Sequence, residues 1–377
     1  MAGAAEILVR AKSVPLYLRG SISGHRWGDA RSSTFREELQ ARLPYIRYLR
    51  TSAEPLHLHS TLKGLVSPAP ILEYLSLSSL GGHRNRRIGQ RLFIPDTIFS
   101  GSTPRLSCLK LCNCNISWES PLMKGLKYLE ILTPSTNARP NLAVWLSALN
   151  EMPQLETLTL HSASPITPPF PSDVTRTVSL PSLARLDILA SSGDCALALA
   201  HLDLPALTWL CPTTISSGPP NGSDVQKLLP YLARHAHGPQ DTQPLQSLLI
   251  ASEGNHTDIL AWLLPDINVQ VHDTPTSLAA TLPTRLALSL RSDHWPGLDA
   301  HLDILDMAIA GLPLDGLVTF AAHDLHSSRN RADLPMYHFL CHLSQKWPLL
   351  QRVRLAPLSL RGFMVMLLED KGGRERP

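Results

Sequence analysis

Histidine beside aspartate is the pattern in this sequence that comes nearest to catalytic chemistry. An imidazole near a carboxylate can act as a general base when a nucleophile or a water molecule is also in place. Four such pairs occur among the 16 histidines: His201-Leu-Asp203, His301-Leu-Asp303, His272-Asp273 and His323-Asp324. The sequence contains no Gly-x-Ser-x-Gly turn, no His-Glu-x-x-His helix and no phosphate-binding loop. We therefore predict a protein that is not an enzyme and has no catalytic residues.

Cysteine is the second residue type that could do chemistry here. Its positions are Cys108, Cys112, Cys114, Cys195, Cys211 and Cys341. On a strand, Cys108 and Cys112 would lie ~13 Å apart, whereas zinc–sulfur bonds are ~2.3 Å long. We therefore predict no metal site and no cofactor. Cys114 instead occupies a position that closes a repeat, where a small side chain helps to satisfy the backbone groups of the loop. No Cys-x-x-Cys pair is present, which favours reduced thiols in an intracellular protein, cytoplasmic or nuclear.

A repeated phrase, Pro-x-Leu-x-x-Leu-x-Leu, indicates the elements that position these residues. Its copies begin at Pro70, Pro104, Pro153 and Pro181, and the last of them ends in Ile188. Proline has a fixed φ and no amide hydrogen, so it ends a helix and turns the chain into a strand. Leucines two apart then point to the same side of that strand, where only a neighbouring repeat can bury them. The phrase predicts strands that start at Leu72, Leu106, Leu126, Leu155, Leu183 and Leu350, with weaker versions at Ile46, Leu207, Leu245, Leu286 and Leu314.

Several segments between these strands have the pattern of return helices. We expect helices over residues 141–150, 223–234, 298–310 and 334–343, with Pro230 bending or dividing the second of them. Strands alternating with helices at a spacing of 20 to 34 residues predict an α/β fold: an irregular leucine-rich-repeat horseshoe with an inner parallel sheet and outer helices or loops. We divide the chain into an N-terminal cap (1–45), the solenoid (46–368) and a polar tail (369–377). After Leu245 the phrase weakens, so a small separate domain is the alternative to a continuing solenoid.

The composition restricts the classes of partner. Charged residues make up 17% of the 377 residues and the formal net charge is +3, which favours neither nucleic acid nor an anionic membrane. No apolar run approaches the ~18–20 residues of a membrane span, and the N-terminus lacks the apolar core of a signal peptide. We therefore expect no nucleic acid and no membrane partner.

The residues between the inward leucines should form a binding surface on the concave face of the sheet. The residues that directly precede the second leucine of each copy form one column: Tyr48, Tyr74, Cys108, Tyr128, Thr157, Arg185 and Trp209. The next contains Arg50, Ser76, Lys110, Glu130, Thr159 and Asp187. Tyrosine, tryptophan and arginine dominate the energetics of protein interfaces. We predict that Tyr48, Tyr74, Lys110, Tyr128, Arg185 and Trp209 bind a protein partner. The alternatives are that strands simply favour aromatic residues, or that an insertion covers this face.

The irregular Pro-x-Leu-x-x-Leu-x-Leu array resembles the F-box/leucine-rich-repeat proteins of mushroom-forming fungi. The segment from Ala5 to Leu18, within residues 1–45, is similar to the one that follows the F-box in that family, and Arg42-Leu-Pro-Tyr-Ile-Arg-Tyr-Leu-Arg50 resembles its first repeat strand. The resemblance implies the substrate receptor of a Skp1–cullin-type ubiquitin ligase. Only four residues precede Ala5, so we expect no F-box in this chain, and a Skp1-type adaptor as a partner only if an upstream F-box exists. The alternative is a free-standing repeat scaffold with no ubiquitin role.

Overall fold

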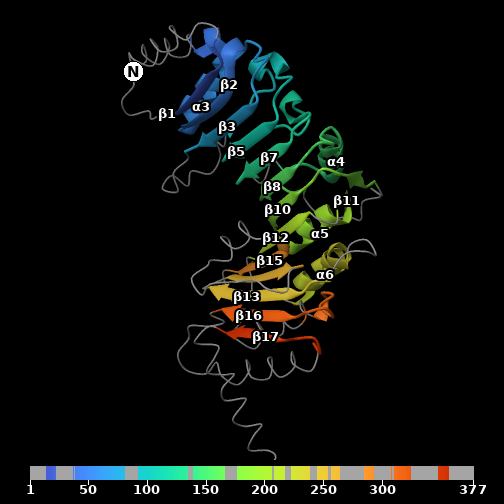
Figure 1. Cartoon of the computed structure of the whole chain (residues 1–377). Coiled ribbons are helices and arrows are strands. Elements are labelled where there is room, and N and C mark those ends of the chain that lie inside the picture. Colours follow the sequence, from blue (N-terminus) through green and yellow to red (C-terminus); the bar gives the residue numbers. More distant parts are fainter. Residues whose placement is uncertain are drawn as a thin grey trace, which may run out of the picture. The chain divides into compact units, whose positions relative to one another are not determined.

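The structure is a computed structural model that divides into two compact units. The first unit is Met1–Leu183 with His201–Asp203, and the second is Ala184–Ala200 with Leu204–Pro377. The residues that the structure describes are 14–22, 37, 39–80, 92–134, 139–165, 176–205, 208–216, 222–237, 244–253, 256–263, 284–292, 307, 310–323 and 347–355. Together they form a mixed α/β fold whose large, mostly parallel sheet contains 13 strands (Figure 1). Two predicted helices, 298–310 and 334–343, fall almost wholly outside these residues.

Six parallel strands make up the sheet of the first unit, and they follow the order of the chain. They are β1 (Leu16–Ile22), β2 (Ile46–Ala53), β3 (Tyr74–Ser79), β5 (Cys108–Cys112), β7 (Tyr128–Leu132) and β8 (Thr157–His161). Two helices of this unit lie wholly within the described residues, α3 (Pro55–Gly64) and α4 (Leu142–Asn150). The Asn141 side chain caps α4 by accepting a hydrogen bond from the Val144 amide at 2.9 Å. Helix α4 begins one residue after the start that we predicted and ends where predicted.

Short elements connect these strands. Two small parallel ladders pair β4 (Leu92–Phe93) with β6 (Cys114–Asn115) and β9 (Val178–Ser179) with β11 (Leu202–Asp203). Three-residue or four-residue 3-10 turns cover Leu43–Tyr45, Ile98–Gly101 and Pro121–Met123. The Cys114 thiol is fully buried and contacts the carbonyl oxygens of Cys112 and Leu77 at 3.3 and 3.8 Å. The Cys114 thiol therefore lies against backbone carbonyl groups of β3 and β5, whereas we predicted a contact with loop backbone groups.

The proline of the repeated phrase lies in a turn before the strand, whereas we predicted that it leads directly into the strand. In four copies, the amide of the first leucine donates to the carbonyl oxygen of the residue before the proline: Leu72 to Ala69, Leu106 to Thr103, Leu155 to Met152 and Leu183 to Leu180. Proline is thus the second residue of a β-turn, for which its fixed φ is suited. Because the turn uses the amide of the first leucine, each strand begins two residues later than predicted, as at Tyr74 and Cys108. The first leucine is buried all the same.

The described residues of the second unit form seven strands in a different arrangement. They are β10 (Arg185–Ala190), β12 (Trp209–Ser216), β13 (Ser247–Glu253), β14 (His256–Trp262), β15 (Thr284–Ser292), β16 (Thr319–His323) and β17 (Arg352–Leu355). Their spatial order is β10-β12-β15-β14-β13-β16-β17, and β14 is antiparallel to both of its neighbours. The prediction of an entirely parallel sheet is therefore wrong at β14. The cause is a hairpin, because only two residues separate β13 from β14 and a parallel pair needs a longer connection.

Two described helices of the second unit pack against each other; the first also packs against β12 and the second against β15. They are α5 (Ser192–Ala200), which we did not predict, and α6 (Gly222–His237). Helix α6 continues past Pro230, so the proline neither divides nor ends it. Strand β16 starts at Thr319 rather than near Leu314, because Leu314 begins a turn that accepts the Leu317 amide.

Candidate binding face of the first unit

The outer face of the first unit's sheet carries the side chains that alternate with the buried leucines. Their columns are in register from strand to strand. Tyr17, Tyr48, Tyr74, Cys108, Tyr128 and Thr157 are successive pairing partners in one column. Arg19, Arg50, Ser76, Lys110, Glu130 and Thr159 form the next. Four of the six residues that we predicted as a binding surface, Tyr48, Tyr74, Lys110 and Tyr128, therefore share this face.

Three tyrosines form a continuous stack at the β1 end of the face. The ring centroids of Tyr48 and Tyr74 are 4.2 Å apart with planes 9° from parallel, and those of Tyr17 and Tyr48 are 6.1 Å apart at 23°. Tyr17 is 64% exposed, whereas Tyr48 and Tyr74 are partly buried. Burial, followed by the neighbouring Tyr48 hydroxyl, raises the pKa of Tyr74, so its phenol stays neutral. We call Tyr17, Tyr48 and Tyr74 the tyrosine stack.

Tyr17 was missing from the predicted column. Pro15-Leu16-Tyr17-Leu18 contains the signal, since the tyrosine lies between two aliphatic residues just after a proline. β1 pairs with β2 in parallel, and a register shift between Leu16 and Tyr17 brings Tyr17 opposite Tyr48. That register shift is a tertiary feature that the spacing of the leucines does not encode.

Tyr128 lies in the same column but outside the stack, and it is held by a carboxylate. Its hydroxyl donates to Glu156 Oε2 at 2.7 Å, and Lys127 Nζ lies 3.4 Å from Glu156 Oε1. The hydrogen bond to Glu156 raises the pKa of Tyr128, and the same bond lowers the pKa of Glu156. Cys108 separates Tyr128 from the tyrosine stack, so the phenol meets solvent and a charged pair rather than another ring.

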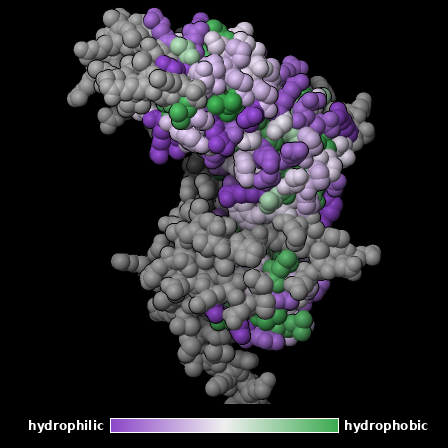
Figure 2. Space-filling model, turned by 45° about the horizontal axis from the view of Figure 1, so that its top comes forward, coloured by the Kyte–Doolittle hydropathy of each residue, from purple (hydrophilic) through white to green (hydrophobic). Residues whose placement is uncertain are grey.

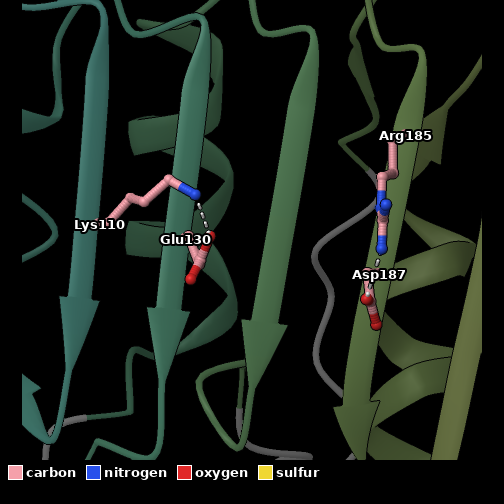
Figure 3. Close-up of polar contacts among 4 residues, drawn as sticks. All are labelled: Lys110, Glu130, Arg185 and Asp187. Atoms are coloured by element: carbon pink, nitrogen blue, oxygen red, sulfur yellow. Dashed lines mark hydrogen bonds and ion pairs between the residues drawn. The ribbon is translucent and has the colours of Figure 1, made fainter. Parts of the chain in front are cut away.

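Ion pairs between neighbouring strands neutralise most charges on this face. Lys110 Nζ donates to Glu130 Oε2 at 2.7 Å, across from β5 to β7 (Figure 3). Burial lowers the pKa of Lys110, but the bond to Glu130 and the charge of that carboxylate outweigh burial and raise it. Arg47 and Glu73 make a similar pair at 2.7 Å between β2 and the residue before β3. Because both pairs are partly exposed, water screens their attraction and each pair contributes little to stability.

Arg19 and Arg50 differ from these paired charges. They are pairing partners on β1 and β2, both are exposed, and no ion pair or hydrogen bond joins either side chain to another described residue. Each arginine lies two residues beyond a member of the tyrosine stack on its own strand, and thus on the same face. The β1 end of the face therefore combines stacked aromatic rings with two adjacent positive charges.

The thiols near this face are poor nucleophiles. Burial raises the pKa of Cys108 to about 11 and that of Cys114 to about 12, from an ordinary value of 9.0. Since only the thiolate is reactive, both side chains behave as small hydrophobic groups. Among the described residues no group of three or more histidine, cysteine or carboxylate side chains is placed to hold a metal ion.

Arg185 and Trp209, the other two predicted binding residues, belong to the second unit. They are pairing partners on β10 and β12, and the Arg185 guanidinium lies 4.0 Å from the centre of the Trp209 ring. Arg185 also reaches Asp187 at 3.5 Å along its own strand (Figure 3). Trp209 and Cys211 are partly buried and pack against a hydrophobic cluster of Leu249, Leu260, Trp262, Ala287 and Ala321. Trp209 thus contributes to a core, with the arginine as its only exposed neighbour in that set.

Only one histidine–aspartate pair lies wholly within the described residues. His201 Nδ1 is 2.9 Å from the Arg176 carbonyl oxygen, and Asp203 is an exposed residue of β11. His201 is thus engaged with backbone in a short ladder. The pairs 272–273 and 301–303, and Asp324, lie outside the described residues.

On the face in view in Figure 2, hydrophobic residues form small separate patches among hydrophilic ones. No helix in the described part of the chain has both the length and the hydrophobicity to cross a membrane. No protein-family model matches the sequence, and no curated protein or solved structure shows significant similarity to it.

Proposed function

We propose that the protein is an irregular leucine-rich-repeat solenoid that recognises another protein through the outer face of its first unit. The observation that carries this proposal is the tyrosine stack beside two exposed arginines, on the neighbouring strands β1, β2 and β3. Tyrosine and arginine give large contact areas and directed hydrogen bonds, and they are enriched at interfaces. A proline turn, a buried leucine and a parallel strand recur together at β3, β5 and β8 of this unit, which supports the solenoid interpretation.

A role as a substrate receptor follows from the resemblance to fungal F-box/leucine-rich-repeat proteins. In such a role the repeats hold the substrate, and a separate helical module holds the Skp1-type adaptor. In this role the repeats catalyse no reaction. The raised pKa values of the Cys108 and Cys114 thiols, which make them unreactive, agree with this. A free-standing recognition scaffold would use the same face without an adaptor.

Site-specific photo-cross-linking tests recognition by this face. A photoreactive phenylalanine analogue replaces Tyr17 in one variant and Leu56 on α3 in a matched control, because the two side chains are similarly exposed at 64% and 72%. In an extract of the source organism, the variant with the probe at position 17 should form discrete adducts that the control does not form. The same adducts from both positions, or none from position 17, would contradict the proposal.

Co-purification then separates the two roles. The protein is isolated from the cells that naturally express it and examined for a bound Skp1-type adaptor. Stoichiometric adaptor would support the ubiquitin-ligase role. Adducts at position 17 without any adaptor would leave recognition intact and assign the protein to the free-standing scaffold.

A further inference from the structure

Among the described residues, the β1 end of the outer face has an unbalanced positive charge. Arg19 and Arg50 are in-register partners on adjacent parallel strands, which lie ~4.8 Å apart. Like charges directly opposite one another destabilise a sheet unless an anion lies between them. Elsewhere on this face Arg47, Lys110 and Lys127 each have a carboxylate within 3.4 Å, whereas among the described residues Arg19 and Arg50 have none.

The tyrosine stack determines what else can bind beside these arginines. Tyr48 and Tyr74 cover one face of each other's ring at 4.2 Å, and Tyr17 stacks beside Tyr48 at 6.1 Å, so the stack presents mainly ring edges and hydroxyl groups to a partner. Ring edges carry the positive part of the aromatic quadrupole and prefer the face of another aromatic ring. The hydroxyls add hydrogen-bond donors next to the guanidinium groups.

On this basis we propose that the β1 end binds an acidic peptide segment of the partner protein, in which carboxylate side chains flank an aromatic residue. The carboxylates bind Arg19 and Arg50, and the aromatic residue packs edge-to-face on the tyrosine stack. An arginine–carboxylate contact is directional and bidentate, which fixes the register of an extended segment. This inference rests on the proposed function and adds the chemical class of the partner.

Single-stranded nucleic acid is the competing ligand for arginine and tyrosine, and two observations disfavour it. Bases bind such surfaces by stacking on free aromatic faces, whereas the Tyr48 and Tyr74 rings already stack on each other. The formal net charge of +3 is also far from the strongly basic balance of nucleic-acid-binding domains.

Selection from a random library of displayed peptides, each about seven residues long, tests the proposal on the full-length protein. Seven extended residues span ~23 Å, enough to cross the stack and both arginines. Three proteins are compared: the wild type, Arg19→Gln/Arg50→Gln, and a control, Lys63→Gln/Arg105→Gln. The control removes two exposed positive charges outside the two columns of this face, one on α3 and one in the turn before β5. The wild type and the control should enrich peptides with aspartate or glutamate beside an aromatic residue, and the double arginine variant should not.

The most enriched peptide is then synthesised and its affinity is measured for all three proteins. It should bind the Arg19→Gln/Arg50→Gln variant about tenfold or more weakly than the wild type, with little change for the control. Affinity for the wild type should also fall as NaCl rises from ~0.05 to ~0.5 M, a readout that needs no variant to fold.

Several results would overturn the inference: no enrichment, enrichment without acidic residues, equal binding by the arginine variant, or affinity that does not change with salt. A single-stranded oligonucleotide that binds the wild type as tightly as the peptide and is lost in the arginine variant would assign the site to nucleic acid. Photo-cross-linking at position 17 requires no acidic partner. Adducts there without an acidic consensus would therefore refute only the peptide chemistry.

Discussion

Strands of the first unit are buried on one side only, whereas the middle strands of the second unit are buried on both. In β3 and β8, partly buried residues alternate with buried ones. In the second unit, residues 247–250, 259–262 and 286–290 are buried without a break. A strand with one face in water alternates buried and more exposed side chains, while a strand covered on both faces needs a near-continuous apolar run. The first unit can therefore offer a binding surface, and the second uses the corresponding side chains, such as Leu260 and Ala287, as core.

A charged substitution should change the unfolding free energy far more in the second unit than on the outer face of the first. Leu260→Lys puts an ammonium group into the hydrophobic cluster of the second unit and should cost more than about 3 kcal/mol of unfolding free energy. Thr159→Lys, on the outer face of the first unit, should change it by about 0.5 kcal/mol or less. Denaturant titration measures both. A Leu260→Lys variant as stable as Thr159→Lys would show that the second unit's face is open.

Aromatic truncation should show the same contrast on a smaller scale. Trp209→Ala removes a ring held between the Arg185 guanidinium and the cluster, and it should cost about 3 kcal/mol. Tyr17→Ala removes a mostly exposed ring and should cost about 0.5 kcal/mol or less. The shift in Tm reports both changes. Equal shifts would place Tyr17 in a core.

Thiol chemistry should be suppressed in both units. Burial raises the pKa of Cys108 to about 11 and that of Cys211 to about 12, so at pH 8 the Cys108 thiolate is about a hundredfold scarcer than for a thiol of pKa 9.0. Iodoacetamide should label Cys108 and Cys211 correspondingly slowly in the native protein and quickly in the unfolded protein, as followed by mass spectrometry of each cysteine peptide. Fast labelling of native Cys108 would contradict its burial.

The same pKa values predict how stability depends on pH. The pKa of each of these thiols is higher in the folded than in the unfolded state. Between pH 9 and about 11–12 the folded protein therefore binds more protons than the unfolded protein does. The stabilisation from the neutral thiols is complete below pH 9 and is lost as the pH rises through this window. Unfolding free energy should fall there, and a Cys108→Ala/Cys114→Ala/Cys211→Ala variant should lose less of it.

The smallest effect on the unfolding free energy should come from the ion pair between Lys110 and Glu130. Lys110 and Glu130 are 39% and 31% exposed, so water screens their attraction. A double-mutant cycle with Lys110→Ala and Glu130→Ala should give a coupling of about 0.5 kcal/mol that falls at high salt. A coupling above about 2 kcal/mol would mean that this part of the outer face is shielded from solvent, against the comparison drawn above.

Sequence reasoning was most successful where a local rule and the tertiary structure agree. The leucine spacing placed Tyr48, Tyr74, Cys108 and Tyr128 in one column because each repeat has the same offset from its turn. It placed the strand starts two residues early, since the use of the Leu72 amide in a turn depends on the conformation around Pro70.

The strand order of the second unit was harder to predict, although the sequence contains a local signal for its hairpin. Gly254-Asn255 is a dipeptide typical of two-residue hairpins, and it separates β13 from β14. The insertion of β15 between β12 and β14 is a long-range pairing that no local pattern specifies. Tyr17 and Glu156 were missed because a register shift and a side-chain contact between repeats bring them to the face.

Hydroxyl-radical footprinting tests the central claim most directly. The chain is oxidised alone and together with the protein captured by cross-linking at position 17, and the modification of each aromatic residue is quantified. The account predicts rapid oxidation of Tyr17 and Tyr128 and slow oxidation of Trp262 in the free chain, with the partner protecting the tyrosine stack. Rapid oxidation of Trp262, or partner protection confined to the second unit, would contradict it.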